Sequence, residues 1–246
     1  MSRVVITLRL IRQHFKSDLP AAIFHFPSER PDPNSQVVSQ LKDLNAKLVE
    51  ASGRDRDPTR EKNYQLKAQS IVECEWAEVI YFDSDNLPAT NPEIMFDAPN
   101  YKRLGVFFAP DYWKTSASNP IWHIIGVQCR DEWEQEAGQI IIDKRRHLDA
   151  MLLSLYMLTD WQYWFYFSDG DKDVFRYAHA YLHPCILLTF TLLDSRCLLF
   201  ESDGHSLDGT WGAVGFLLPH RQATSAHTQC SSMTMLAGPC SSTTTS

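Results

Sequence analysis

The chain of 246 residues is long enough for one α/β domain with a substantial buried core. Its net charge is −7 and it has no long Lys/Arg stripe, which argues against binding nucleic acid, because such binding needs basic side chains on the phosphates. Its six cysteines include no CxxC pair, which argues against a zinc ribbon or a thioredoxin-type redox site.

The N-terminal part of the sequence alternates helix and strand patterns. Apolar residues at helical spacing predict helices over 3–16, 37–48 and 64–74. Compact apolar runs predict buried strands over 19–26 and 79–82, and polar or turn-rich segments separate these elements. The first helix mixes basic with apolar residues, so we expect it not to be a signal peptide, which needs an unbroken apolar stretch.

The same alternation continues further along the chain. Apolar runs predict strands over 104–109 and 139–142, and helical spacing predicts helices over 145–161 and 171–183. Helices that alternate with buried strands are typical of an α/β fold. We therefore expect one domain over 1–183, with a mainly parallel central sheet flanked by helices.

The end of the chain lacks this regularity. Residues 184–221 show only a weak pattern, and residues 222–246 are rich in Ser and Thr, which predicts a disordered tail. The most hydrophobic run, 185–200, is interrupted by Asp194 and Arg196, so we predict no membrane segment in the chain.

The most informative motif is a pair of carboxylates, Asp83 and Asp85, directly after the apolar strand over 79–82. The carboxyl ends of strands are where α/β proteins bind ligands. Mn²⁺ and Mg²⁺ prefer oxygen ligands, and they bridge carboxylates to the oxygens of a diphosphate. We therefore predict that Asp83 and Asp85 hold a divalent cation, which would offset charge on a departing nucleoside diphosphate. A solvated acidic turn is the alternative interpretation of these two residues taken alone.

Two other interpretations of the acidic turn can be weighed against the sequence. A calcium EF-hand loop needs Gly at its sixth position and Glu at its twelfth, where this chain has Pro88 and Ile94. An aspartyl-phosphate phosphatase would use Asp83 as its nucleophile. It stays an alternative, although Leu87 stands where such enzymes usually have a hydroxyl residue.

Four segments, in the same order along the chain, resemble one enzyme family. They are VIYFDSDNLPATNPEIMFD, FFAPDYWKTSASNPIW, CRDEWEQEAGQIIIDKRRH and GDKDVFRYA. Over roughly residues 15–183 the chain resembles glycosyltransferase family 71, the fungal α-1,2- and α-1,3-mannosyltransferases with a GT-A fold. The resemblance implies retaining transfer of mannose from GDP-mannose to a mannoside acceptor in protein glycosylation. It also implies Mn²⁺ or Mg²⁺ as the cofactor and the Golgi as the location.

The resemblance also implies roles for individual residues. Asp83 and Asp85 match the metal-binding DxD motif of the family, and Glu136 and Asp173 are the implied catalytic carboxylates. The residues implied in donor and acceptor binding are Lys67, Asp111, Tyr112, Trp113, Gly138, Gln139 and Lys172. Two alternatives stay open: Tyr112 and Trp113 could be core residues, and the Asp residues of GDKD could simply cap a helix.

The chain also departs from the family pattern at both ends. It starts within the first helix, so we expect the first nucleotide-binding strand of the fold to be missing. A neighbouring strand would then lack a partner for its backbone groups and form an exposed edge. The family's late metal-binding His has no clear counterpart, because His205 and His220 lie in no motif. A non-catalytic, truncated glycosyltransferase remnant is therefore the alternative function.

Overall fold

The structure is a computed structural model, and it describes residues 2–60, 62–129, 131–168, 170–184, 201–202 and 215–219. The strands are β1 (Ala21–His25), β2 (Ala46–Glu50), β3 (Glu78–Asp83), β4 (Asn86–Leu87), β5 (Val106–Pro110), β6 (Gln135–Asp143), β7 (Glu201–Ser202) and β8 (Gly215–Pro219). The helices are α1 (Ser2–Arg9), α2 (Gln36–Asp43), α3 (Gln65–Glu73), α4 (Pro99–Leu104), α5 (Ile121–Ile124), α6 (Lys144–Thr159), α7 (Trp161–Trp164) and α8 (Lys172–Leu182).

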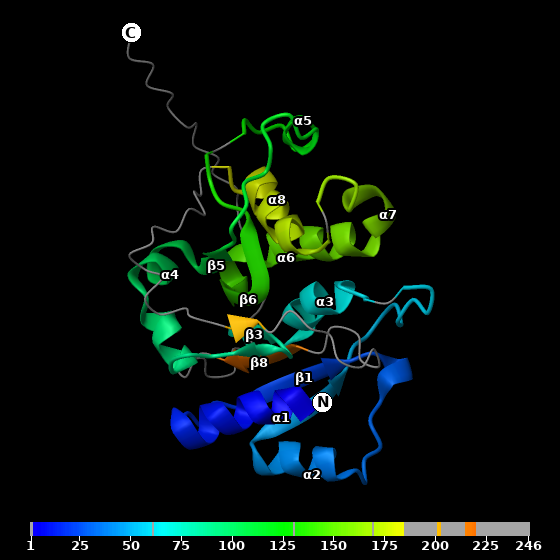
Figure 1. Ribbon diagram of the computed structural model, residues 1–246, viewed down its shortest axis with the longest axis vertical. Coiled ribbons are helices and arrows are strands. Elements are labelled where there is room, and N and C mark those ends of the chain that lie inside the picture. Colours follow the sequence, from blue (N-terminus) through cyan, green and yellow to red (C-terminus); the bar gives the residue numbers. More distant parts are fainter. Residues whose placement is uncertain are drawn as a thin grey trace.

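A six-stranded sheet lies between two layers of helices. Helices α1 and α2 cover one face of the sheet, and α3, α6 and α8 cover the other (Figure 1). Strand β3 contributes to both cores because successive side chains of a strand point to opposite faces. Val79 and Tyr81 belong to the core beside α3, α6 and α8, whereas Ile80 and Phe82 belong to the core beside α1 and α2.

The sheet is mixed, which corrects the prediction of a mainly parallel sheet. Its strand order is β2-β1-β8-β3-β6-β5, and only β1 and β2 form a parallel pair. Strands β1, β2, β3 and β5 do run in one direction, but β8 and β6 run the opposite way and separate them. The apolar composition of a buried strand is the same in both orientations, so the sequence pattern did not reveal this.

Strand β8 belongs to the weakly patterned segment over 184–221 and lies in the interior of the sheet. It lies between β1 and β3 and is antiparallel to both, with Leu217 in register with Ala22 on one side and Tyr81 on the other. Leu217 and Leu218 are fully buried. Strands β1 and β3 therefore each have a partner on both sides. The expectation that the first nucleotide-binding strand is missing stays a prediction. The segment of β8 has only a weak strand pattern of its own, and it forms a strand because it pairs with β1 on one side and with β3 on the other.

The predicted helix over 37–48 is also partly wrong. Helix α2 starts after its N-cap Ser35 and ends at Asp43, and strand β2 follows. Asn45 has a φ of 54°, in the left-handed region that ends helices and that Asn tolerates better than most residues. The spacing of Leu44 and Leu48 fits a helix by coincidence, because Leu48 lies on a strand that pairs in parallel with β1.

The other predicted elements up to residue 183 form where they were expected, with shifted ends. The predicted helix over 3–16 is α1 followed by a π-helical turn at Leu10–His14. None of the described helices is both long and apolar enough to cross a membrane. The predicted tail over 222–246 and both His205 and His220 lie outside the described residues.

Candidate functional site

Three motifs that are distant in sequence meet at the ammonium of Lys67. This side chain belongs to α3 and is only 3% exposed. Its Nζ forms ion pairs with Asp83 Oδ2 at 3.0 Å and Asp171 Oδ2 at 2.7 Å, and it donates a hydrogen bond to the carbonyl of Ala137 at 2.8 Å. Each of its three N–H groups therefore has a protein oxygen within reach. Lys67 joins the DSD turn, the EQEAGQ segment and the GDKD segment.

Lys67 is a charged group in a buried position. Burial alone would lower its pKa, but the charges of Asp171 and Asp83 outweigh burial and raise the pKa above its ordinary value. Lys67 therefore stays an ammonium over the whole physiological pH range. The side chain is a permanent positive charge inside the cluster that it forms with Asp83, Asp171 and Ala137.

The Ala137 carbonyl can reach Lys67 because β6 bulges at this point. Phe108 of β5 is in register with Ile140, but the next residue of β5, Ala109, is in register with Glu136. Residues 137–139 therefore have no partner on β5. Since β6 is antiparallel to β3, the bulge lies at the same edge of the sheet as the acidic turn.

Gly138 lies within this bulge, close to the side chain of Asn86. A Cβ atom at this position would lie 2.3 Å from Nδ2 of Asn86, which follows the acidic turn. Any larger residue at this position would therefore force the side chain of Asn86 to shift. The sequence predicted a close approach of the Gly138 backbone to the donor sugar, and the structure shows a close approach to Asn86. The neighbouring Gln139 is buried and lies opposite Phe82.

The two carboxylates of the DSD turn have different surroundings. Both oxygens of Asp83 are used, because the Tyr81 hydroxyl donates to Oδ1 at 2.6 Å and Lys67 contacts Oδ2. Burial, followed by the charge of Asp83, raises the pKa of Tyr81 well above its ordinary value, so this hydroxyl stays a donor. Asp85 is 45% exposed, and its nearest ion-pair partner is Arg3 at 3.9 Å. Asp83 is thus held by protein groups, whereas Asp85 faces solvent.

Oxygen ligands of this kind suit Mn²⁺ or Mg²⁺. Within the described part of the chain, no group of three or more His, Cys, Asp or Glu side chains is arranged to hold a metal ion. The acidic turn supplies two carboxylates: Asp85 is open to solvent, and Asp83 is bound to Tyr81 and Lys67. Such a donor set fits a cation that takes its other ligands from water and substrate phosphates, as Mg²⁺ commonly does.

Glu136 lies at the same edge of the sheet. Its side chain is exposed, and its Oε1 accepts a hydrogen bond from the backbone N–H of Gly138 at 2.7 Å. Nevertheless, the protein around the carboxylate displaces enough water to raise its pKa, although Gly138 and Lys67 act in the opposite direction. The charges of Asp83 and Asp111 contribute to the increase, so Glu136 lies within electrostatic reach of the DSD turn.

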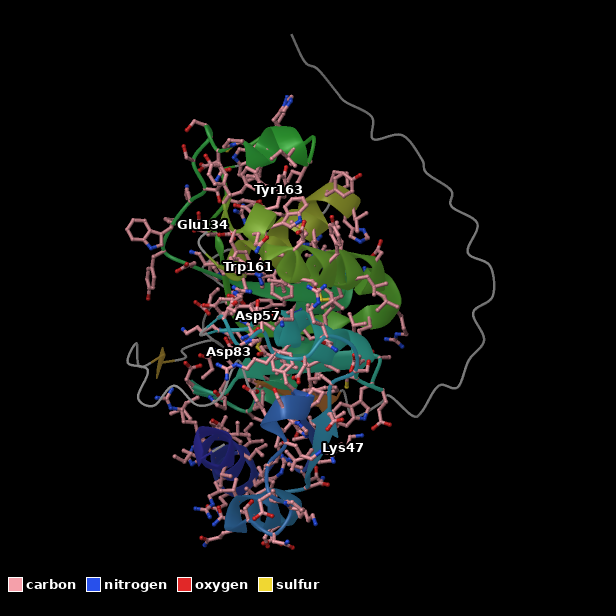
Figure 2. The ribbon with its side chains drawn as sticks, turned by 90° about the vertical axis from the view of Figure 1, so that its right-hand side faces the viewer. Lys47, Asp57, Asp83, Glu134, Trp161 and Tyr163 are labelled. Atoms are coloured by element: carbon pink, nitrogen blue, oxygen red, sulfur yellow. The ribbon has the colours of Figure 1, made fainter. Side chains whose placement is uncertain are left out.

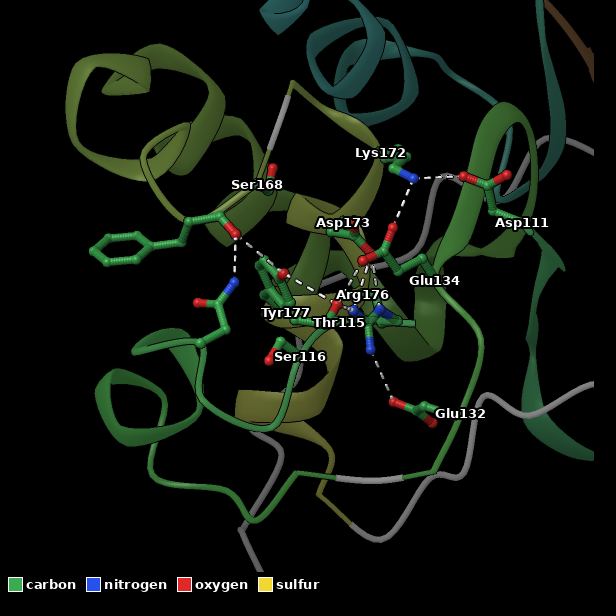
Figure 3. A network of polar contacts seen from close by, with 12 residues as sticks. Asp111, Thr115, Ser116, Glu132, Glu134, Ser168, Lys172, Asp173, Arg176 and Tyr177 are labelled. Atoms are coloured by element: carbon green, nitrogen blue, oxygen red, sulfur yellow. Dashed lines mark hydrogen bonds and ion pairs between the residues drawn. The ribbon is translucent and has the colours of Figure 1, made fainter. Parts of the chain in front are cut away.

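The start of α8 carries a second group of ion pairs (Figure 3). Lys172 forms ion pairs with Asp111 at 2.5 Å and with Glu134 at 2.7 Å. Asp111 and Lys172, both predicted to bind the substrate, are therefore paired with each other. The backbone of Asp111 also donates to the carbonyl of Glu134. These contacts attach the PDYW segment to the start of α8.

Asp173 lies deeper in this network. It is 2% exposed and pairs with Arg176 at 3.0 Å, and Arg176 also contacts Glu132 at 3.3 Å and the hydroxyl of Thr115 (Figure 3). Burial raises the pKa of Asp173 to about 6, although Arg176 opposes the increase. The structure therefore brings Asp171, rather than Asp173, to the Lys67 cluster. Asp171 was not among the predicted site residues, and its position in the GDKD motif was the only signal for it.

Tyr112 and Trp113 of the PDYW segment are 90% and 69% exposed. The alternative that they are core residues is therefore wrong. Their backbone is held in place, because Glu134 donates its N–H to the carbonyl of Trp113 at 2.8 Å. Two aromatic rings are thus presented to solvent next to the Lys172 ion pairs.

Comparison with known proteins adds a family to this geometry. A family model described as "Mannosyltransferase putative" matches residues 2–135 and 129–185. Alpha-1,2-mannosyltransferase MNN21 of Candida albicans is 27% identical over 163 residues, which cover 48% of this chain and 25% of that protein. Alpha-1,2-mannosyltransferase MNN5 of Saccharomyces cerevisiae is 23% identical over 180 residues, which cover 50% of this chain and 31% of that protein.

The aligned regions amount to between a quarter and a third of the length of these two relatives. The family match itself covers most of the chain, and it includes all three motifs that meet at Lys67. The chain therefore belongs to this family of mannosyltransferases.

Proposed function

We propose that this chain carries most of the catalytic domain, of GT-A type, of an α-mannosyltransferase. The reaction is transfer of mannose from GDP-mannose to a mannoside acceptor in protein glycosylation, with retention of configuration. The observation that supports it most directly is the meeting of the DSD, EQEAGQ and GDKD motifs at Lys67 in a member of a mannosyltransferase family. The relatives described above are alpha-1,2-mannosyltransferases, which supports α-mannosyl transfer.

The residues of the acidic turn have separate roles in this proposal. Asp85, which faces solvent, binds Mn²⁺ or Mg²⁺ together with the donor diphosphate. When bound, the cation offsets the negative charge that develops on the leaving diphosphate. Asp83 does not need to move on binding, because Tyr81 and Lys67 already hold it. Lys67 acts as a positioning residue that keeps Asp83 and Asp171 together.

The reacting sugar lies beside Glu136 in this proposal. Glu136 is exposed at the edge of the sheet next to the DSD turn, and its raised pKa reflects the protein that surrounds it. Gly138 and Gln139 shape the donor site through the bulge of β6. The catalytic role implied for Asp173 stays a prediction, because its carboxylate is directed at Arg176.

The PDYW segment and the start of α8 bind the donor or the acceptor in this proposal. Asp111 and Lys172 form one rim, and the exposed rings of Tyr112 and Trp113 offer flat surfaces for sugar rings. A location in the secretory pathway, in the Golgi, follows from the proposed role in protein glycosylation.

The proposal can be tested by a donor screen with purified protein and Mn²⁺, in which nucleotide release is measured for each sugar nucleotide. We expect release from GDP-mannose that depends on Mn²⁺ and on a mannoside acceptor. Asp85→Asn should abolish the release that requires Mn²⁺. Asp97→Asn is the control, because Asp97 is an exposed Asp that pairs with Lys102, and this variant should release nucleotide as the wild type does. Release from a different sugar nucleotide alone would contradict the proposed donor. Mn²⁺ binding without turnover of any donor would favour the alternative of a non-catalytic remnant.

A further inference from the structure

Three histidines, none of them in the proposed site, form a cluster between α6 and α8. His147 lies on α6, His179 lies on α8, and His183 follows the end of α8. The ring centre of His147 lies 5.3 Å from that of His179 and 5.1 Å from that of His183, and the other two centres are 6.0 Å apart. His147 and His179 are buried, with 2% and 0% of their surface exposed. We refer to these three residues as the histidine cluster.

Each of the two buried rings has one nitrogen without a partner. Nε2 of His147 donates to the carbonyl of Leu104 at 2.8 Å, and Nδ1 of His179 donates to the carbonyl of Phe175 at 2.8 Å. A neutral imidazole carries one N–H, so these bonds leave Nδ1 of His147 and Nε2 of His179 as acceptors. Among the described residues, neither of these two nitrogens is hydrogen-bonded. The cluster therefore contains two buried lone pairs.

The ligand that suits these lone pairs is a proton. A metal ion needs several ligands, and the described residues bring no three His, Cys, Asp or Glu side chains together as such a set. A proton needs only one nitrogen. The side chain of His183 is 22% exposed, and its Nε2 contacts the carboxylate of Asp149, which is 55% exposed, at 3.1 Å. His183 therefore connects the buried rings with solvent.

The surroundings of the two buried rings disfavour a positive charge. The ring of Phe108 on β5 is nearly perpendicular to that of His179, at 5.0 Å between ring centres. On the other side of the cluster, Arg146 adds a positive charge near His147. Burial is the main cause that lowers the pKa of His147, and burial also lowers the pKa of His179 to about 3. Both rings are therefore neutral at neutral pH.

Neighbouring carboxylates offer little compensation for a proton on these rings. Asp149 of α6 is the carboxylate that acts on both His147 and His179, but it is exposed and already contacts His183. The charged side chains towards the ends of the neighbouring helices α3 and α4 are bound to other groups; they are Glu73, Lys102 and Arg103. A charged ring therefore gains more from water than from its place in the fold.

The histidine cluster belongs to the helix that begins at the candidate site. The first residue of α8, Lys172, pairs with Glu134. In the view of Figure 2, Glu134 lies above Asp83, which belongs to the cluster around Lys67. His179 lies about two helical turns further along α8. Helix α8 is therefore attached at its start by ion pairs and near its end by the histidine cluster.

We propose that the histidine cluster is an acid-sensitive contact between α6 and α8. While its buried rings are neutral, the end of α8 stays packed on α6. When acid adds a proton to either ring, the end of α8 separates from α6, because the charged ring then reaches water. The folded state binds these protons less tightly than the unfolded state does. The contribution of the cluster to stability is therefore present at neutral pH, and it is lost as pH falls below the ordinary His pKa of about 6.5. This inference does not depend on the reaction that the chain performs.

The test is amide hydrogen exchange of α8 in the wild type and in His179→Phe, from pH 7.5 to pH 5. Phe has a similar shape, but it takes up no proton and needs no hydrogen bond. The opening constant of the α8 amides should rise about thirtyfold more in the wild type than in this variant, the factor for one His whose pKa falls from about 6.5 to about 3 on folding. The control is His123→Gln, which removes an exposed histidine from α5 and should behave like the wild type.

His179→Gln gives a second measurement, for the case that Phe does not fit. Gln keeps an N–H for the carbonyl of Phe175 and is not protonated in this pH range, so it should reduce the pH dependence in the same way. Asp173 also titrates in this range, but all four proteins contain it, so it does not affect the comparison. An equal rise of the opening constant in the wild type and in both His179 variants would overturn the inference. Variants that are weakened equally at pH 7.5 and pH 5 would also overturn it, because they would indicate packing alone.

Discussion

Two buried cations of this protein, Lys67 and Arg176, have similar partners but different surroundings. Each is 3% exposed and pairs with two carboxylates, Lys67 with Asp83 and Asp171, and Arg176 with Asp173 and Glu132. The carboxylates around Arg176 are as buried as the cation itself, whereas those around Lys67 are partly exposed.

This difference distinguishes the Lys67 cluster, a candidate functional site, from the Arg176 network, which has a structural role. The Lys67 cluster lies at the sheet edge beside the open carboxylates of Asp85 and Glu136, where a ligand can reach it. The Arg176 network is closed, and it attaches α8 to the segment that carries the PDYW motif. A buried ion pair is therefore not enough to identify a functional group. A functional role is indicated instead by the access of solvent to the ion pair and by neighbouring carboxylates that are open to a ligand.

The largest expected effect is that of Lys67→Met. This change leaves Asp83 and Asp171, which are mostly shielded from solvent, without their cation, which should lower the free energy of unfolding by about 3–5 kcal/mol. Urea unfolding followed by circular dichroism measures this change. Adding Asp171→Asn should recover part of the stability, because one of the two uncompensated charges is removed. Lys114→Met, which removes an exposed ion pair with Asp131, is the control and should change stability by less than about 1 kcal/mol.

A somewhat smaller effect is expected for Arg176→Met. Asp173 and Glu132 lose their cation, but Asp173 already has a raised pKa and can take up a proton, so the loss should be about 3 kcal/mol at neutral pH. The two variants should differ most in their activity per folded molecule. It should fall in Lys67→Met and persist in Arg176→Met, as measured at a temperature where both are folded. Equal loss of activity in the two variants would mean that the two regions do not differ in function.

The pH dependence of stability should reveal the buried carboxylate of Asp173 in the Arg176 network. The pKa of Asp173 is raised to about 6 in the folded protein. A raised pKa means that the folded state binds the proton more tightly, so this contribution is present below the ordinary pKa and is lost as pH rises through about 6. Between about pH 4 and pH 6, wild type should therefore lose on the order of 2 kcal/mol more than Asp173→Asn. Urea unfolding of both proteins across this range tests the sign, and a wild-type gain in the same range would contradict it.

The smallest effect on stability is expected for Asp85→Asn. Asp85 is exposed, and its one ion pair among the described residues is the 3.9 Å contact with Arg3, so its loss should change the free energy of unfolding by less than about 0.5 kcal/mol. Binding of Mn²⁺, measured by calorimetry in the presence of GDP, should nevertheless be lost. A large drop in stability with intact Mn²⁺ binding would show that the open region is structural as well.

Most elements of the fold follow from local patterns, and the exceptions share one cause. The apolar runs of β1, β3, β5 and β6 are recognisable because each run is compact and bounded by turn residues. Strand β2 was hidden by a helical spacing of leucines, and β8 by its position in a weakly patterned segment. Both are strands because of their neighbours, β1 for β2 and the pair β1 and β3 for β8. Strand pairing is a long-range contact, which a local pattern does not contain.

The same division applies to the candidate site. The sequence by itself determined that Asp83 and Asp85 follow a buried strand, because the apolar run and the turn are adjacent. Only the tertiary structure decided that Asp171, and not Asp173, reaches Lys67. Residues two apart at the start of a helix point to nearly opposite sides, since each residue turns the helix by about 100°. The packing of α8 against β6 and α6 therefore selects which of the two carboxylates enters the site.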